Sequence, residues 1–435
     1  MNKREKKCFN PADFNHFKQQ LLLWADGFEV ACYLDSNGYR LDQYATYEGL
    51  VGVGIKEELT SSIGDAFESL KHFYENKKDW LFGFLTYDLK NEVEALHSNN
   101  SDNLQLPDLY FFQPQWVIYL QNQNVFIEGK NPERIFKEIT QVQPQAQNAV
   151  FSDLHLQQKI SKETYISTVQ SIKRDIEHGE VYELNFCQEF FAQNAQIAPV
   201  HLFQQLNQIS PSPFAAYLKL NDKYLLCASP ERFLKKEGNT LLSQPIKGTI
   251  KRSSNPLLDQ QLQHNLQNDP KERAENVMIV DLVRNDLTRA SKTGTIKVKE
   301  LCSIYSFQQV HHLISTIESH LLEDLHFTKA LEYAFPMGSM TGCPKIRAME
   351  LIEDYEQSKR GLYSGSVGYI TPLGDFDFNV VIRSILYHST QQYLSFQIGG
   401  AITYDSTPAQ EYEECLLKAK AILQVLSKPK MSKTF

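Results

Sequence analysis

Hydrophobic and polar positions divide the chain into two parts with different patterns. Up to about residue 150, short aromatic runs of strand type, such as 29–34 and 80–87, are separated by turn residues. From Ser161 onward, helical periodicity alternates with strand patterns, beginning with a helix expected over 162–177. The pattern predicts a sheet-rich region, 1–150, followed by a second region of mixed helices and strands, 151–430.

A helix expected over 271–286 begins with a strong capping signal. Asp269 can cap it, Pro270 suits the first helical position, and Glu272 would complete a capping box. The apolar residues around Glu275 predict a mostly buried helix: Ala274, Val277, Met278, Val280, Leu282 and Val283. Glu275 lies in its second turn, where an unpaired carboxylate would be costly, so a metal ion or a basic partner is expected nearby.

A later helix repeats this logic, with Thr407 as the cap, Pro408 in the first position and Gln410 completing the box. One face of this helix is charged and carries Glu411, Glu414 and Lys418. Carboxylates from the two helices could together hold Mg²⁺, which takes oxygen ligands. The alternative from the spacing alone is a solvated, charged helix face.

A lone amine stands between two residues that constrain the backbone. Pro245 fixes its own φ and Gly248 permits turns that other residues resist, which presents Lys247 at a defined position. Glu231 follows a strand expected over 224–229, at the kind of strand end that often borders a cleft. By themselves, a lysine and a glutamate in such positions are more often exposed surface side chains.

Two glycine-bearing stretches suit an anionic ligand. The first, 335–345, leads into a helix whose free backbone N–H groups could face an anion. The second, 397–402, contains Gly399 and Gly400 in a strand, where a ligand could approach the backbone closely. Neither stretch matches a phosphate-binding or dinucleotide-binding fingerprint, so a carboxylate ligand is expected.

Composition narrows the class of protein. The chain has 435 residues, of which 42% are hydrophobic, and a formal net charge of −8, which argues against nucleic-acid binding. Its seven cysteines are an odd number with no C-x-x-C pair, as in a reduced cytoplasmic protein. No run approaches about 18 apolar residues, so no membrane span is expected.

Several long motifs together resemble the chorismate-utilising enzymes. They occur in the order 245–249, 273–287, 310–316, 344–350 and 360–369. The resemblance covers about residues 160–427 and implies large antiparallel β-sheets sandwiched orthogonally and flanked by helices. It is thinner in the first third, where 34–36 resembles the family motif at a tryptophan pocket and marks Ser36. Such a pocket could bind tryptophan structurally, serve feedback control, or merely pack a sheet.

Lysine at position 247 separates branches of this family, because anthranilate and isochorismate synthases usually carry alanine there. The resemblance therefore implies conversion of chorismate to 4-amino-4-deoxychorismate, for p-aminobenzoate and folate synthesis. Ammonia would come from a separate glutamine amidotransferase subunit. Two alternatives remain: an anthranilate or isochorismate synthase component, and a non-catalytic subunit that binds the amidotransferase.

The resemblance also implies roles for individual residues. The Lys247 amine would add to C2 of the ring, and Glu231 would protonate the departing C4 hydroxyl. Burial is expected to lower the pKa of the lysine and to raise that of the glutamate. Mg²⁺ would be held by Glu275 and Glu414, with Glu411 acting through water.

The expected substrate-binding set consists of Thr249, His312, Ser339, Tyr363, Arg383, Gly399, Gly400 and Lys418. One departure from the family stands beside this set: Glu183 occupies a position where glutamine is common. An additional acid near Lys247 could change the protonation of the amine, so the roles of Glu183 and Asn185 stay open.

Overall fold

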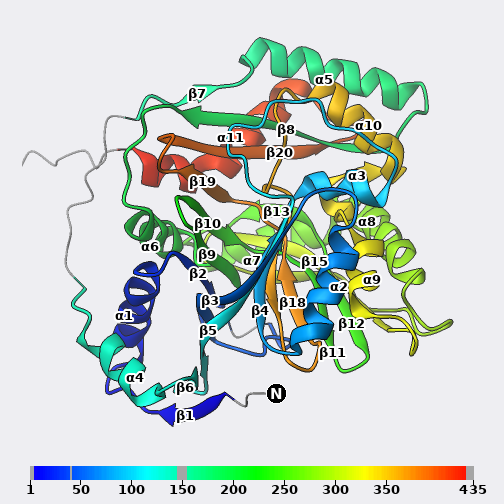
Figure 1. The fold of residues 1–435 in the computed structure, drawn as a ribbon. Coiled ribbons are helices and arrows are strands. Elements are labelled where there is room, and N and C mark those ends of the chain that lie inside the picture. The colour runs from blue at the N-terminus through cyan, green and yellow to red at the C-terminus, as the bar shows by residue number, and fades with distance from the viewer. Residues whose placement is uncertain (1–3, 40–41, 145–153, 428–435) are drawn as a thin grey trace, which may run out of the picture.

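The computed structural model describes residues 4–39, 42–144 and 154–427. In this part of the chain, hydrogen bonds join the strands into one extensive antiparallel network, with helices packed around it (Figure 1). The predicted α+β class with large antiparallel sheets flanked by helices is confirmed. The region boundary predicted near residue 150 lies outside the described residues.

The strands alternate with helices over most of the chain. The strands are β1 Glu5–Phe9, β2 Val30–Asp35, β3 Gly49–Ser61, β4 Leu81–Leu85, β5 Leu109–Gln121, β6 Asn124–Gly129, β7 Gln157–Gln158, β8 Glu183–Ala192, β9 Phe214–Leu220, β10 Lys223–Ser229, β11 Arg232–Glu237, β12 Thr240–Gln244, β13 Ile246–Lys251, β14 Lys297–Ser306, β15 Val310–His320, β16 Gly342–Cys343, β17 Ser366–Ile370, β18 Phe376–Asn379, β19 Ser384–His388 and β20 Tyr393–Ile402. The helices are α1 Phe14–Asp26, α2 Ala66–Lys77, α3 Lys90–Val93, α4 Pro132–Gln141, α5 Lys162–Glu177, α6 Pro199–Ile209, α7 Pro256–Asn268, α8 Pro270–Thr288, α9 Phe327–Ala334, α10 Lys345–Tyr355 and α11 Pro408–Leu426. Two short 3₁₀ turns are Tyr87–Leu89 and Gly338–Met340.

Strands from the early and late parts of the chain pair directly. β2 is antiparallel to β9, and β4 is antiparallel to β17. The aromatic runs of the first third therefore bury their side chains against strands that come more than a hundred residues later. This sharing of the sheet explains why β2 and β4 are almost entirely buried.

A second set of pairings places the glycine-bearing strand. β20 pairs with β8 so that Gly399 lies opposite Cys187 and Ala401 lies opposite Asn185. Helices α5, α10 and α11 lie beside these two strands at one end of the molecule (Figure 1). β13 pairs with β15, and α8 packs against both of these strands. The cavity described below lies where these two groups of elements meet.

Helix α8 is amphipathic and does not have the mostly buried character that its composition predicted. Ile279, Val280 and Val283 are buried, but Ala274 and Val277 face solvent. The prediction was wrong because an apolar composition does not by itself show that both faces of a helix are covered.

The starts of α8 and α11 were predicted correctly, but the capping details differ. The Asp269 side chain accepts hydrogen bonds from the backbone N–H groups of Lys271 and Glu272. The capping box is absent, because the Asp269 N–H is bonded to the carbonyl of Leu266. Thr407 makes no side-chain cap hydrogen bond.

Two expectations from composition can be compared with the structure. All seven cysteines are free. Among the residues that the structure describes, none of the helices combines the length and the apolar character needed to cross a membrane.

These caps predict a difference in stability between two matched variants. Asp269→Ala removes two hydrogen bonds to the first turn of α8 and is expected to lower the free energy of unfolding by about 1 kcal/mol. Thr407→Ala is the control, since it removes no cap bond, and should change it by less than about 0.5 kcal/mol. Urea unfolding of the two variants measures the difference, and equal losses would contradict the assignment of the cap.

Candidate active site

A large cavity of about 1320 Å³ lies between β13, β15, β20, α8 and α11. It brings together every catalytic, metal-binding and substrate-binding residue that the sequence predicted, with Ser36 alone lying elsewhere. The lining includes Glu231, Lys247, Thr249, Glu275, His312, Ser339, Tyr363, Arg383, Gly399, Gly400, Glu411, Glu414 and Lys418. These residues are spread over nearly 190 positions of the chain.

A β-bulge directs Lys247 into the cavity. Ile246 lies opposite Ile314 and Thr249 lies opposite His312, so β13 contains one residue more than β15 between these pairs. Gly248 makes this possible with a φ of +94°, which residues with a side chain rarely adopt. The side chain of Lys247 is only 10% exposed.

The amine of Lys247 lies among carboxylates. Its Nζ donates a hydrogen bond of 2.5 Å to Oε1 of Glu183, whose side chain is 1% exposed. Burial works against the charged amine, but Glu183, Glu275 and Glu231 outweigh it, so the pKa of Lys247 is raised. The sequence-based expectation that burial would lower this pKa was wrong, because it did not include the nearby acids.

Glu231 has the properties expected of a buried acid. It follows β10 through Pro230, is 4% exposed, and accepts a hydrogen bond of 2.6 Å from the hydroxyl of Ser339. Burial raises the pKa of Glu231 to about 7, against the Ser339 hydrogen bond and the charge of Lys247, which lower it. A substantial fraction of this carboxyl group is therefore protonated near neutral pH.

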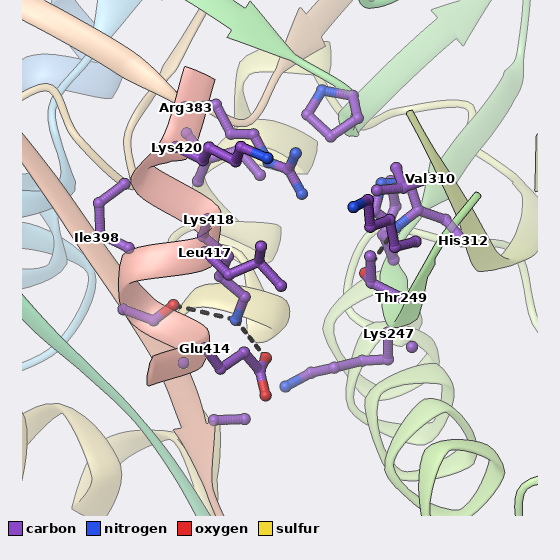
Figure 2. Close-up of a pocket in the computed structure, with 18 of the residues that line it drawn as sticks. Lys247, Thr249, Val310, His312, Arg383, Ile398, Glu414, Leu417, Lys418 and Lys420 are labelled. Carbon is purple, nitrogen blue, oxygen red and sulfur yellow. Dashed lines mark hydrogen bonds and ion pairs between the residues drawn. The ribbon is translucent and has the colours of Figure 1, made fainter. Parts of the chain in front are cut away.

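Arg383 presents a cation that is free to meet an anionic ligand. Within the described part of the chain, its guanidinium makes no hydrogen bond and no ion pair, although it lines the cavity. Figure 2 shows it projecting into this space. A planar guanidinium can bind a carboxylate through two parallel hydrogen bonds. Its position therefore suits a ligand carboxylate.

His312 contributes a neutral ring to the wall of the cavity. Its Nδ1 is hydrogen-bonded to the hydroxyl of Thr249 at 2.7 Å. Burial, together with the charge of Arg383, lowers the pKa of His312 to about 3. The imidazole is consequently uncharged near neutral pH and can serve as a hydrogen-bonding surface.

The backbone of β20 forms the opposite wall. A Cβ atom at Gly399 would lie 2.3 Å from Sγ of Cys187, so no larger residue fits there. Lys418 donates a hydrogen bond of 3.2 Å to the carbonyl of Gly399 and pairs with Glu414 at 3.0 Å, as the dashed lines in Figure 2 show. Tyr363 is buried and accepts a weak hydrogen bond from Cys187.

The three predicted metal ligands differ in their surroundings. Glu275 is 14% exposed, and burial raises its pKa to about 7. Glu414 is more exposed, Lys418 lowers its pKa, and Lys247 points toward it in Figure 2. Glu411 is buried and accepts a hydrogen bond of 2.6 Å from Ser406.

These donors fit a magnesium ion of a particular kind. In the described ranges, no group of three acidic, histidine or cysteine side chains is arranged to hold a metal by itself. Mg²⁺ usually keeps several waters and takes only one or two carboxylates, with substrate oxygens completing its shell. The cation nearest to the buried Glu275 is Lys271, at 3.8 Å. A hard cation held by Glu275 and Glu414 would therefore compensate the negative charge of the partly buried Glu275.

Two residues outside the predicted set, Asn276 and Glu272, also contribute to the site. Asn276 is buried in α8, and its amide donates a hydrogen bond of 3.2 Å to the carbonyl of Lys247, which anchors the bulge. Asn276 lies on the same helix face as the buried Ile279 and Val280, and a polar residue on an apolar face was the signal in the sequence. Glu272 was predicted to cap a helix, but it lines the cavity, and burial together with Glu414 raises its pKa.

Ser36 lies at a separate cavity of about 70 Å³, and its hydroxyl donates to the carbonyl of Glu48. The guanidinium of Arg232 lines the same space, where it pairs with Asp42 and Asp377 at 2.9 Å each. This volume is far below the roughly 300 Å³ at which small-molecule pockets begin. Tryptophan binding at this position stays a prediction.

Comparison with known proteins identifies the class that this fold and cavity represent. Residues 31–424 match the family described as chorismate binding enzyme, and the chain belongs to this family. It is 36% identical to aminodeoxychorismate synthase component 1 of Escherichia coli (strain K12) over 351 residues, 80% of this chain and 76% of that protein. It is 31% identical to the protein of the same name from Bacillus subtilis (strain 168) over 416 residues, 89% of this chain and 88% of that protein.

A solved structure supports the same fold. The crystal structure of anthranilate synthase component I from Streptococcus pneumoniae TIGR4 matches with a TM-score of 0.77 and 25% sequence identity. The match covers 87% of this chain and 92% of that chain. The family therefore includes relatives with at least two different names, and the residues of the cavity must distinguish between their activities.

Proposed function

We propose that this protein converts chorismate and ammonia to 4-amino-4-deoxychorismate, the precursor of p-aminobenzoate in folate synthesis. The observation that carries the proposal is the buried amine of Lys247, which shares a cavity with the buried acid Glu231. The aminodeoxychorismate synthase relatives support this choice among the activities of the family.

In the proposed reaction, Lys247 is the nucleophile and Glu231 is the general acid. The neutral amine bonds to C2 of the ring, both ring double bonds shift by one position, and the C4–O bond breaks as Glu231 protonates the departing oxygen to give water. Ammonia then bonds to C4, the C2–N bond breaks, and Glu231 recovers a proton from the incoming nitrogen. The elevated pKa of Glu231, about 7, suits an acid that must be protonated at the start.

The remaining residues would hold the substrate. Arg383 suits a carboxylate of chorismate, because its guanidinium is free of protein partners within the described residues. The further contacts come from residues around the ring: Thr249, His312, Ser339, Tyr363, Gly399, Gly400 and Lys418. Fixing the ring next to Lys247 and Glu231 lowers the entropic cost of the reaction.

Glu275 and Glu414 would hold Mg²⁺, with Glu411 acting through a water molecule. When bound, this ion would neutralise a substrate carboxylate and orient the ring. The acidic side chains support this assignment through their chemistry, since carboxylate oxygens are the ligands that Mg²⁺ prefers.

Ammonia would come from a glutamine amidotransferase partner. The relatives from Escherichia coli and Bacillus subtilis are both named as component 1, which implies a second component in their case. An anthranilate synthase activity is the second candidate, because a structural relative carries that name. Mass spectrometry of the product formed from chorismate, Mg²⁺ and ammonia distinguishes the two.

Replacing the amine tests the nucleophile. Lys247→Ala should abolish a covalent enzyme–substrate adduct and slow formation of the 4-amino product by at least about 100-fold, since the proposed nucleophile is removed. Intact-protein mass spectrometry detects the adduct, and chromatography detects the product. The control is Lys297→Ala, an exposed lysine of β14. Unchanged turnover of Lys247→Ala would rule out covalent catalysis by this residue.

Replacing a carboxylate tests the metal assignment. Glu275→Gln should raise the Mg²⁺ concentration needed for half-maximal activity at least about tenfold, because an ionised ligand is lost. A metal titration of the steady-state rate measures this. Asp281→Asn, on the exposed face of the same helix, should leave the titration unchanged. If Glu275→Gln and wild type give the same titration, Glu275 is not a ligand.

The pKa of Glu231 predicts a pH dependence. A general acid must be protonated, and its protonated fraction falls as pH rises through about 7, so the rate of adduct formation should fall above this pH. The hydrogen bond from Ser339 stabilises the carboxylate and lowers this pKa. Ser339→Ala should therefore move the falling limb upward by about one pH unit. Rapid-mixing measurements between pH 5 and 9 test this, and a downward shift would contradict it.

A further inference from the structure

Glu183 is the most deeply buried carboxylate near the reacting amine. It begins β8, lies opposite Cys343 of β16, and its side chain is 1% exposed. Oε1 accepts the hydrogen bond from Lys247, while Oε2 is buried and has no hydrogen-bond partner among the described residues. A buried carboxylate oxygen without a partner is costly, so this group has an unused capacity to take up a proton.

The surroundings of Lys247 create a problem that the proposed reaction must solve. An amine attacks a carbon atom only in its neutral form, yet the acids around Lys247 stabilise the ammonium form. The proton therefore needs an acceptor within hydrogen-bond distance at the moment of attack.

The other nearby acids do not meet this requirement. Glu231 is bonded to Ser339 and must itself deliver a proton to the leaving hydroxyl. Glu275 and Glu414 make no hydrogen bond with Lys247 in the described part of the chain, and the cations paired with them are Lys271 and Lys418. Glu183 is thus the carboxylate in direct contact with the amine.

We propose that Glu183 is the proton acceptor for Lys247, an inference that rests on the proposed function. A proton moves from Nζ to Glu183 as the nitrogen lone pair forms the bond to C2, and the C4 oxygen leaves as water with the proton of Glu231. When ammonia bonds to C4 and the C2–N bond breaks, the amine of Lys247 takes the proton back from Glu183. The enzyme therefore returns to its starting protonation state.

Glutamine has nearly the same shape as glutamate but a different capacity for protons. A glutamine oxygen can accept a hydrogen bond from the amine, but an amide does not take up a proton near neutral pH. It also places no negative charge beside the ammonium group. In this chain the Glu183 carboxylate raises the pKa of the Lys247 amine, and in the proposed step it also accepts the proton from that amine.

The test measures the first half of the reaction alone. Wild type and variants are mixed with chorismate and Mg²⁺ without ammonia, and the adduct is followed by quenched-flow mass spectrometry. Glu183→Gln should slow adduct formation by about 100-fold, as expected for a lost proton acceptor. Calorimetry should find its affinity for chorismate within twofold of wild type. Glu183→Asp, which keeps a carboxylate, should recover at least tenfold of the lost rate.

Chemical rescue provides the readout that a purely structural role would not change. Glu183→Ala leaves space for a small carboxylate, so added formate should accelerate its adduct formation at least tenfold, whereas chloride at equal ionic strength should not. The matched control is Glu180→Gln, three residues before Glu183 in the chain. Glu180 is exposed and pairs with Arg347. This variant should behave as wild type.

Each outcome bears on the inference. Wild-type rates in Glu183→Gln, or a Glu183→Ala variant that formate does not rescue, would overturn the role of Glu183. If wild type itself forms neither adduct nor 4-amino product, the proposed function fails instead. Circular dichroism spectra identify a variant that does not fold. If Glu183→Gln or Glu183→Ala does not fold, the rate of adduct formation in Glu183→Asp is compared with that of wild type. A rate lowered more than 100-fold despite the retained carboxylate would count against the inference.

Discussion

The site depends on one electrostatic constraint, the burial of a lysine amine among several carboxylates. A charged group loses its hydration when it is buried, and here only neighbouring opposite charges compensate for that loss. Lys247 is paired with Glu183, while the buried Glu231 and the partly buried Glu275 have pKa values raised to about 7. The cavity thus holds the Lys247 amine in its charged form beside acids that are close to losing their charge.

The fold creates this environment by bringing together elements that are distant in the sequence. β8 supplies Glu183, the bulge of β13 supplies Lys247, and α8 supplies both Glu275 and the amide that anchors the bulge. The extra residue in β13 turns the lysine out of its regular alternation, and Gly248 accommodates the resulting backbone angle. The geometry on which the chemistry depends is therefore built into the backbone pairing.

The pairing of Lys247 with Glu183 also affects the proton on the amine. A carboxylate at position 183 raises the basicity of the amine, and within the proposed reaction it must then also provide a route for the proton. Both effects follow from the negative charge of the carboxylate, which a glutamine of nearly the same shape would lack. The protonation of a nucleophile can in this way be tuned by a single neighbouring residue on a conserved fold.

Local signals in the sequence determined much of the fold. The helix over 162–177 was predicted with its observed limits, and Asp269 and Pro270 marked the start of α8, because caps and periodicity act within a few residues. The family resemblance also named a set of residues that the cavity brings together. Tertiary structure decided what depends on distant neighbours: the exposure of Val277, the absence of the capping box at Glu272, the use of Asn276, and the raised pKa of Lys247. The energy of a charge depends on every polar or charged group within a few ångströms. The packing of the chain determines those neighbours, and the order of the residues alone does not show them.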